Sequence, residues 1–522
     1  MNEIIVFIVA IFLRILSSYG VNQGFDSYGH IYFSKELKKQ RKGPFGSIKT
    51  KVIGSEYFSA PFLWHWLIEF IPIKILSKYP NFMNPILDSI AVVIFYTFII
   101  NIGYEEDLAF IAALLYILTP MWFTKFAMGP RIADFTPRVS GEIATNLFFI
   151  FIIFPVNDFE GYSFAIATIF AVYVMGSSKF GVQALIFMTP LVSVLLETFN
   201  PLLSVIFGLL ILIILSGGKY AYSLIEQFEH LRWYFLKNMK GGTKVSNRNK
   251  IDKRYARESK ESLKRYILRL LGLFISVNAY TGLLIKMPVL WVTCILMLMS
   301  DNIMISSNIW VPVLVGILMF FIINIRWLLF LGEAERYINH VAFFILLMGI
   351  EVAHQENLHD IYWLIIIYGT LFLIAEVFLN KMTSRKNIIE MENKNILSFL
   401  AGIRPTTVLT FPYHAGGGVY RIMSETPHKT IFPYTISDKN RKKLENGYLL
   451  DYPYFNLSKL ENANDEFNVN VFVLRTADVM EKFGANWKPS SSWIEYELGL
   501  KLQKVFVNKN YIYLLDKNAM SE

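Results

Sequence analysis

Long, uninterrupted apolar runs recur along this chain, from residue 3 to residue 380. A helix that crosses the hydrocarbon core of a bilayer needs roughly 20 apolar residues, and most of these runs approach that length. With 54% hydrophobic and 16% aromatic residues over 522 positions, the chain carries more apolar surface than a soluble protein uses. We therefore expect a polytopic membrane protein. This excludes a cytosolic enzyme, a disulfide-stabilised secreted domain and a disordered scaffold.

The runs predict an all-α membrane domain of about 11–13 transmembrane helices over residues 1–380, followed by a small α/β soluble domain over residues 381–522. The first run lacks a basic segment before it and a cleavage site after it, so we interpret it as a retained span. The candidate spans are residues 3–19, 84–103, 107–124, 139–156, 160–176, 180–197, 200–217, 264–284, 286–300, 308–325, 338–354 and 360–380.

Three polar segments interrupt this pattern. Residues 20–83 form a predicted outer loop with juxtamembrane helices, in which the apolar stretch 61–76 is short and carries Glu69, Pro72 and Lys74. Residues 218–263 form a basic loop, which the positive-inside rule places in the cytoplasm. Five candidate spans follow it, so residues 381–522 are expected to be extracytoplasmic.

The number of spans leaves one alternative open. If the N-terminus and the basic loop are both cytoplasmic, an even number of spans must separate them. The runs give seven without 61–76 and eight with it. Either 61–76 crosses the membrane, or one of the runs between residues 160 and 217 does not.

The first loop contains an acid directly after the first span. Asp26 and His30 are four residues apart, on one face of a predicted helix that Tyr28 helps to bury. Asp26 is placed to act as a base at the interface, or it caps the helix N-terminus; His30 orients it or is structural. The basic residues that follow fit a phosphate group or a solvated surface: Lys35, Lys38, Lys39, Arg41, Lys42, Lys49 and Lys51.

Two further segments combine arginines with acids at span ends. Arg131, Asp134, Arg138 and Glu142 lie within residues 125–142 and suit a site that grips a phosphate and positions a hydroxyl or a metal, or a salt-bridged loop. Glu333, Glu335 and Arg336, in residues 331–340, are costly at the mouth of a span unless they pair or bind something. Lys179, in the break between two runs, is a binding candidate or a plain loop lysine.

Several chemistries are disfavoured. The only cysteine, Cys294, allows no disulfide and no cysteine metal cage, and no His pair stands at metal-ligand spacing beside a further ligand. No HExxH, GxSxG or Walker sequence is present. The net charge of +9 fits contact with an anionic lipid bilayer better than nucleic acid, for which we expect no binding.

One span, a long outer loop that opens with an acid, the segment APFLWHWL (60–67) and an Arg/Asp loop together resemble the GT-C superfamily of polytopic glycosyltransferases. This group includes protein O-mannosyltransferases, lipid A aminoarabinose transferases and oligosaccharyltransferase catalytic subunits. The resemblance covers about the first 180 residues, with residues 332–337 as a weaker match. It implies a GT-C-like fold, a catalytic acid at Asp26, and an arginine-then-aspartate loop at Arg131 and Asp134.

The resemblance implies an enzyme of the cell (cytoplasmic or inner) membrane. It would move a hexose or pentose from a polyprenyl-phosphate donor to a protein, lipid or glycan acceptor on the outer face. Candidate catalytic residues are Asp26, His30 and Asp134; candidate substrate-binding residues are Tyr28, Arg131, Arg138, Glu142, Lys179, Glu333, Glu335 and Arg336. The second outer loop lacks a DxD pair, so a divalent cation is an option without assigned ligands. The alternatives are a transporter or flippase of lipid-linked sugars, and a glycan polymerase or ligase.

Overall fold

The computed structural model describes residues 2–19, 21, 25–52, 55–58, 62–126, 129–130, 134–155, 160–238, 248–249, 256–257, 261–299, 303–356, 358–383, 395–411, 418–431, 469–475, 502–507 and 511–516. The chain forms two compact units. Unit 1 comprises residues 1–23, 79–220 and 242–384, and unit 2 comprises residues 24–78, 221–241 and 385–522. This division differs from the predicted split at residues 380/381, because the first loop belongs with the C-terminal part.

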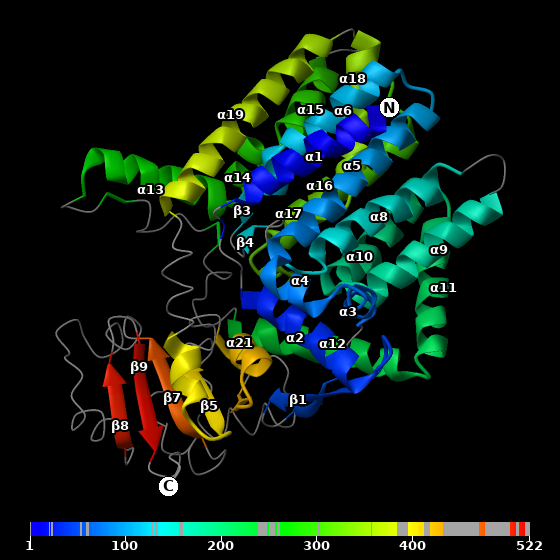
Figure 1. The fold of residues 1–522 in the computed structure, drawn as a ribbon. Helices are drawn as coiled ribbons and strands as arrows, with labels where there is room; N and C mark the ends of the chain where they lie inside the picture. Colours follow the sequence, from blue (N-terminus) through cyan, green and yellow to red (C-terminus); the bar gives the residue numbers. More distant parts are fainter. Residues whose placement is uncertain are drawn as a thin grey trace. The chain divides into compact units, whose positions relative to one another are not determined.

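Unit 1 is a bundle of apolar helices (Figure 1). Helices α8 and α18 are buried along most of their length and form its centre. The helices of unit 1 are α1 (Asn2–Ser18), α5 (Met83–Asn101), α6 (Glu106–Leu118), α7 (Pro120–Phe123), α8 (Arg138–Ile153), α9 (Glu160–Ser177), α10 (Lys179–Leu195), α11 (Asn200–Leu215), α13 (Leu263–Ser276), α14 (Ala279–Lys286), α15 (Pro288–Met299), α16 (Ser307–Ile323), α17 (Glu335–Asn339), α18 (Ala342–Glu356) and α19 (His359–Thr383).

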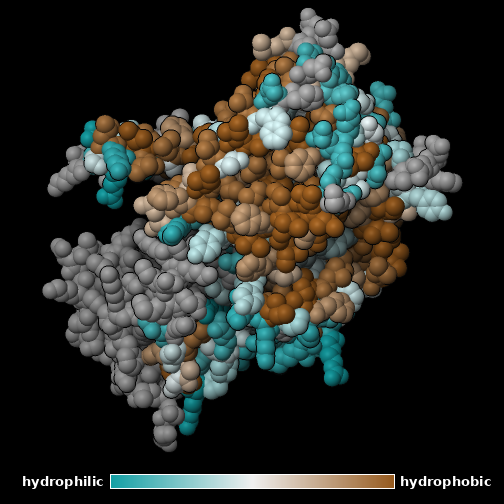
Figure 2. Space-filling view, turned by 45° about the horizontal axis from the view of Figure 1, so that its top comes forward, coloured by the Kyte–Doolittle hydropathy of each residue, from teal (hydrophilic) through white to brown (hydrophobic). Residues whose placement is uncertain are grey.

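The outer helices of this bundle turn apolar side chains outward. On α1, Ile4, Ile8 and Phe12 recur at helical spacing and are 66%, 57% and 63% exposed. Comparable stripes on α5, α11 and α19 add to a broad apolar surface, which is brown in Figure 2. A surface of this extent needs a lipid or protein cover.

Length and composition alone qualify two of the described helices as membrane spans, Pro80–Asn101 and Asp360–Met382. Two strongly bent helix pairs bring the number to four if each pair is one span. Shorter apolar helices follow the predicted runs at Gly161–Ser177, Lys179–Leu195, Pro288–Met299 and Ser307–Ile323. The helical, apolar character of the chain is therefore confirmed, and the predicted total of about 11–13 spans stays a prediction.

Three predicted runs are divided in the structure. The run 107–124 is split into α6 and α7 around Thr119. The run 264–284 is split into α13 and α14, which meet at an angle of 88°. The stretch 61–76 forms two helices of six residues each, α3 (Leu63–Ile68) and α4 (Ile73–Lys78). Six residues extend about 9 Å along a helix axis, so neither helix reaches across a bilayer.

A buried ion pair joins the first three long helices of unit 1. Arg14 on α1 donates from Nε to Asp88 Oδ2 on α5 at 2.5 Å, and from its other nitrogens to the carbonyl oxygens of Ile117 and Tyr116 at 2.6 and 3.2 Å. The Tyr116 hydroxyl donates to Asp88 Oδ1 at 2.9 Å. Every nitrogen of this guanidinium is satisfied, as a buried charge requires.

Unit 2 contains a seven-stranded mixed sheet with the order β2-β1-β6-β5-β7-β9-β8 (Figure 1). Two strands come from the first loop, and the other five come from the C-terminal segment. Strand β1 runs parallel to β6, with Val52 opposite Thr430. The strands are β1 (Ile48–Val52), β2 (Ser55–Phe58), β5 (Thr407–Phe411), β6 (Lys429–Thr430), β7 (Val469–Arg475), β8 (Leu502–Val507) and β9 (Tyr511–Asp516). The sheet is therefore not a product of residues 381–522 alone.

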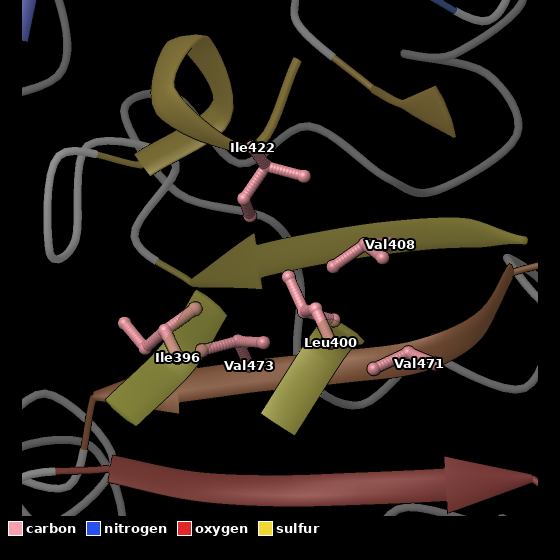
Figure 3. Close-up of a cluster of buried hydrophobic side chains, with 6 residues drawn as sticks. All are labelled: Ile396, Leu400, Val408, Ile422, Val471 and Val473. Carbon is pink, nitrogen blue, oxygen red and sulfur yellow. The ribbon is translucent and has the colours of Figure 1, made fainter. Parts of the chain in front are cut away.

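Helices pack against this sheet. The helix over residues 395–401 and α21 (Gly418–Glu425) contribute Ile396, Leu400 and Ile422 to a small core (Figure 3). Val408 of β5 and Val471 and Val473 of β7 complete it from the sheet. The first loop adds α2 (Phe25–Gln40), which contacts α21, and α12 (Lys219–Asn238) belongs mainly to the same unit.

The composition of unit 2 concerns one predicted placement. Residues 221–241 lie in one compact unit with residues 24–78. The basic loop 218–263 was predicted on the opposite side from the first loop. That placement stays a prediction, and the shared unit favours the same side as the first loop for residues 221–241.

This arrangement can be tested with single cysteines in a Cys294→Ser background. Lys42→Cys, Glu229→Cys and Lys429→Cys place an exposed thiol in each of the three segments of unit 2. In sealed membranes, we expect a membrane-impermeant thiol reagent to modify all three from the same side. Labelling of Glu229→Cys only from the opposite side would contradict the arrangement.

Candidate functional site

The turn between α16 and α18 carries a buried cluster of charges. Every residue from Glu333 to Ile350 is buried, which includes the acids and arginine predicted in the segment 331–340. The turn begins at Gly332, whose φ of +114° lies in the region that favours glycine. A Cβ at this position would also lie 3.3 Å from the ring of Phe180, so the turn approaches α10 closely.

Arg336 is the centre of this cluster. Its Nε donates to Glu333 Oε2 at 3.0 Å, and its guanidinium carbon lies 3.6 Å from the centroid of the Phe180 ring. Burial and the nearby Arg138 lower the pKa of Arg336 to about 10, which still leaves it charged at neutral pH. Burial opposes ionisation of Glu333, but Arg336, Arg248 and Arg138 outweigh it and hold the pKa of this carboxyl below its ordinary value.

Two further basic residues converge on the same turn. Arg248 is 5% exposed and forms a short ion pair with Glu335. Lys286, at the end of α14, is 2% exposed and interacts electrostatically with Glu335 and Glu333. Neither basic residue stood out in the sequence, because Arg248 is one of many in a basic loop and Lys286 is a lone lysine between apolar runs.

Helix α8 forms the opposite side of the cluster through polar residues one turn apart. Asn339 Nδ2 donates to Glu142 Oε1 at 3.1 Å, and Asn146 Nδ2 donates to the Asn339 carbonyl at 2.9 Å. Asn146 Oδ1 accepts from the Phe343 amide at 3.0 Å. These bonds fix the buried turn to α8. The sequence pattern did not single out Asn146 or Asn339. The spacing of Glu142 and Asn146, four residues apart in a mainly apolar helix, was the one signal that could have identified Asn146.

The cluster retains unused hydrogen-bond donors. Among the residues that the structure describes, Arg336 Nη1 and Nη2 have no hydrogen-bond partner, and neither has Arg138 Nε nor Arg248 Nε and Nη1. Buried polar groups are almost always paired, so unpaired guanidinium nitrogens at one place favour an acceptor that binds there, although Glu335 Oε2 in the same cluster is also unpaired among the described residues. A phosphate group, with several anionic oxygens, has the chemistry that such donors require.

The predicted site residues thus divide into two groups. Arg138, Glu142, Glu333, Glu335 and Arg336 meet in the cluster in unit 1. Asp134, which precedes Arg138 by four residues in the sequence, is buried. Its backbone carbonyl oxygen accepts a short hydrogen bond from Asn84 of α5. Lys179 is exposed at the start of α10.

Arg131 lies outside the described residues. A pocket shared by Asp26 and Arg336 stays a prediction, since these two residues belong to different units.

The predicted residues of the first loop lie on α2 in unit 2. Asp26 is exposed in the first turn of this helix, where a carboxylate interacts favourably with the helix dipole. Tyr28 lies under the guanidinium of Arg421, with 5.4 Å between the guanidinium carbon and the ring centroid. Arg421 also pairs with Glu425 at 2.7 Å.

His30 pairs with a residue that the sequence did not single out. Its Nδ1 lies 2.8 Å from Nε2 of His65 on α3, and the two rings stack with centroids 5.0 Å apart. Phe33, Phe62 and Trp64 surround the pair. Burial and the neighbouring His30 hold the pKa of His65 well below its ordinary value. His30 therefore connects α2 to α3, which supports a positioning role.

Some of the basic residues of the first loop have structural partners. Lys35 Nζ donates to the Ser424 carbonyl at 2.7 Å, and Lys51 Nζ donates to the Met423 carbonyl at 3.0 Å. Both carbonyls belong to the last turn of α21, where cations stabilise the helix dipole. These two lysines therefore bind protein in unit 2, and the phosphate role predicted for the whole basic run is not needed to explain them.

The described residues contain no group of three or more His, Cys, Asp or Glu side chains that could hold a metal ion. The possible divalent cation thus has no ligand set among them.

No family model and no curated protein sequence matches the chain. Among solved structures, it is similar to the oligosaccharyltransferase AglB from Archaeoglobus fulgidus in complex with an inhibitory peptide and a dolichol-phosphate. This match has 11% identity and a TM-score of 0.49, and it covers 92% of this chain and 70% of that chain. An A. fulgidus oligosaccharyltransferase complex with zinc and sulfate matches with 13% identity and a TM-score of 0.48, over 90% of this chain and 68% of that chain.

The histidine pair predicts a pH-dependent stability of unit 2. Because the pKa of His65 is lower in the folded than in the unfolded protein, the unfolded chain binds more protons below about pH 6.5. We expect stability to be complete above that pH and to fall as the pH decreases, by at most about 1.4 kcal/mol per pH unit. Hydrogen exchange of α2 and α3 between pH 7.5 and 5.5 measures the effect.

His65→Gln should weaken this pH dependence, whereas His354→Gln, at an exposed position in unit 1, should leave it unchanged. An identical pH profile in His65→Gln and the wild-type protein would contradict the assignment.

Proposed function

We propose that this chain is a membrane glycosyltransferase that moves a sugar from a polyprenyl-phosphate donor to an acceptor on the outer face of the membrane. The observation that carries the proposal is the set of unpaired, buried guanidinium nitrogens on Arg336, Arg138 and Arg248. They form a cationic site inside a helical unit whose outer surface is apolar. A lipid-linked phosphate matches both properties, because its tail needs an apolar environment and its headgroup needs fixed cations.

In this proposal the donor phosphate binds at Arg336 and Arg138. As the bond between the anomeric carbon and the phosphate oxygen breaks, negative charge develops on the departing phosphate. Fixed guanidinium groups in a dry site stabilise that charge, which is worth about 3 kcal/mol for one well-placed donor. Glu333 and Glu142 hold the arginines in place, directly and through Asn339.

Asp26 is the proposed general base. It accepts the proton of the acceptor hydroxyl or amide while the acceptor atom forms its bond to the anomeric carbon. Three features support the choice: Asp26 is exposed, it follows the first span directly, and the pairing of His30 with His65 holds its helix. The proposal assigns no step to a metal ion. The outer-face location follows from a cytoplasmic N-terminus and one span before Asp26.

A transporter or flippase would need unpaired charges along a path through the bundle. Three acids lie inside predicted spans, Asp88, Glu351 and Glu376. Asp88 has both carboxylate oxygens bonded, to Arg14 and Tyr116, and Glu351 accepts hydrogen bonds from Tyr104 and Gln355. This arrangement favours an enzyme. A glycan polymerase or ligase would use the same donor site and would differ in its acceptor.

The catalytic role of Asp26 can be tested by Asp26→Asn. If Asp26 is the base, transfer should fall by roughly 10²–10⁴-fold, while donor binding and membrane insertion are retained. A carboxylate that only interacts with the helix dipole would contribute about 0.3–1 kcal/mol of stability and leave transfer nearly unchanged. Asp107→Asn is the matched control, since Asp107 is also an exposed acid in the first turn of a helix.

The phosphate site can be tested without leaving a buried charge unpaired. Arg336→Gln alone would remove one ion-pair partner of the buried Glu333 carboxylate, which can cost up to about 3–5 kcal/mol, and misfolding would obscure the result. The double variant Glu333→Gln with Arg336→Gln neutralises both partners and keeps their size. We expect it to fold and to bind a polyprenyl phosphate at least tenfold more weakly.

A second neutralised pair serves as the control. Arg14→Gln with Asp88→Asn removes a buried ion pair outside the cluster and should leave polyprenyl-phosphate binding unchanged. Equal affinity in the wild-type protein and the Glu333/Arg336 double variant would place the donor phosphate elsewhere.

A further inference from the structure

Helix α13 is separate from the helix that follows it. The chain turns by 88° between α13 and α14. Each helix has its own N-terminal cap: Ser262 accepts from the Arg265 amide, and Asn278 accepts from the Tyr280 and Thr281 amides. The Asn278 cap lies within the apolar run 264–284 and shows that the sequence encodes the start of a second helix there. The apolar helix α15 begins two residues after the end of α14.

The residues of α13 are distributed by polarity around the helix. At 100° per residue, Arg265, Arg269 and Gly272 fall on one narrow arc. Leu263, Ile267, Leu270, Leu271 and Phe274 fall on the opposite arc. Leu263, Ile267 and Leu271 are 58%, 47% and 49% exposed within the described structure. Figure 2 shows this helix with brown and teal side chains together at its surface.

Basic residues are concentrated at the start of the helix. Lys264 and Arg265 are exposed. Arg269 pairs with Glu261 at 2.7 Å and donates to the Ala256 carbonyl at 2.8 Å, which folds the preceding segment and exposed Arg257 back toward α13. This end of the helix thus combines a net positive charge with an exposed apolar face, a pattern typical of helices that lie at a membrane surface.

We propose that α13 lies in the plane of the membrane interface, with its apolar arc against the acyl chains and Lys264 and Arg265 bound to anionic lipid headgroups. Its 14 residues extend about 21 Å, less than the roughly 30 Å of a hydrocarbon core. Crossing would also carry Arg269, in the middle of the helix, into the hydrocarbon core, where charges are costly. The partner is the lipid surface, and this inference does not depend on the proposed function.

The single cysteine of the chain makes a direct test practicable. In a Cys294→Ser background, spin labels are placed one at a time along residues 263–275, and the full-length protein is reconstituted in vesicles of phosphatidylcholine and phosphatidylglycerol. We expect oxygen accessibility to peak at Leu263, Ile267, Leu271 and Phe274, and accessibility to a water-soluble nickel chelate to peak at Arg265 and Gly272. Immersion depth should repeat with the helical period and show no trend along the helix.

Three results would overturn the proposal. A steady increase of depth from residue 264 to residue 275 would show a membrane-crossing helix. High nickel accessibility on both arcs would place α13 in water. Low accessibility of the apolar arc to both reagents would show that protein covers it.

The lipid charge is tested separately. Lys264→Gln with Arg265→Gln should abolish the dependence of immersion depth on phosphatidylglycerol, since each basic side chain strengthens binding to an anionic surface about fivefold. Lys219→Gln with Lys381→Gln removes two basic residues elsewhere and should retain that dependence. Equal depth of the wild-type helix with and without phosphatidylglycerol would refute the headgroup contact.

Discussion

The cost of burying charge governs unit 1 of this protein. Arg14 and Asp88 show how a buried pair is accommodated, because every guanidinium nitrogen and both carboxylate oxygens have a partner. Arg336 follows the same principle only in part, since one nitrogen is bonded to Glu333 and two have no partner among the described residues. The first pair is structural. The second arrangement is incomplete within the described protein, which is the reason to interpret it as a binding site.

Sequence patterns were sufficient to predict helices and charged clusters where the relevant interactions are local. The apolar runs predicted α1, α5, α8 and α16. The acids and arginines at span ends identified Arg138, Glu142 and Arg336, because charges beside apolar runs need a partner. Asn146, Lys286 and Phe180 were missed, since a single residue in a run gains its role only from a distant neighbour.

The errors have different physical causes. A hydropathy average over the run 264–284 does not register the helix cap at Asn278, so it predicted one helix where two meet at 88°. The spacing of residues 493–506 is typical of an amphipathic helix, but residues 502–506 lie in strand β8, because pairing with β9 outweighs that pattern. The cytoplasmic side predicted for the basic loop stays a prediction, although residues 221–241 belong to the same unit as the first loop. Strand pairing thus overrode a local pattern at residues 502–506, whereas the break at Asn278 is itself a local signal that hydropathy does not register.

The shared sheet of unit 2 has a consequence for biosynthesis. Lys35 and Lys51 bond to carbonyls 372–389 residues later in the chain, and β1 pairs with β6 over a comparable separation. While the chain is being made, the first loop emerges long before its partners exist. Until the last segment is synthesised, strand β1 lacks its neighbour β6 and helix α2 lacks its contact with α21. Assembly of this unit is therefore a late event, and a prematurely terminated chain would leave α2 without the helix that holds it.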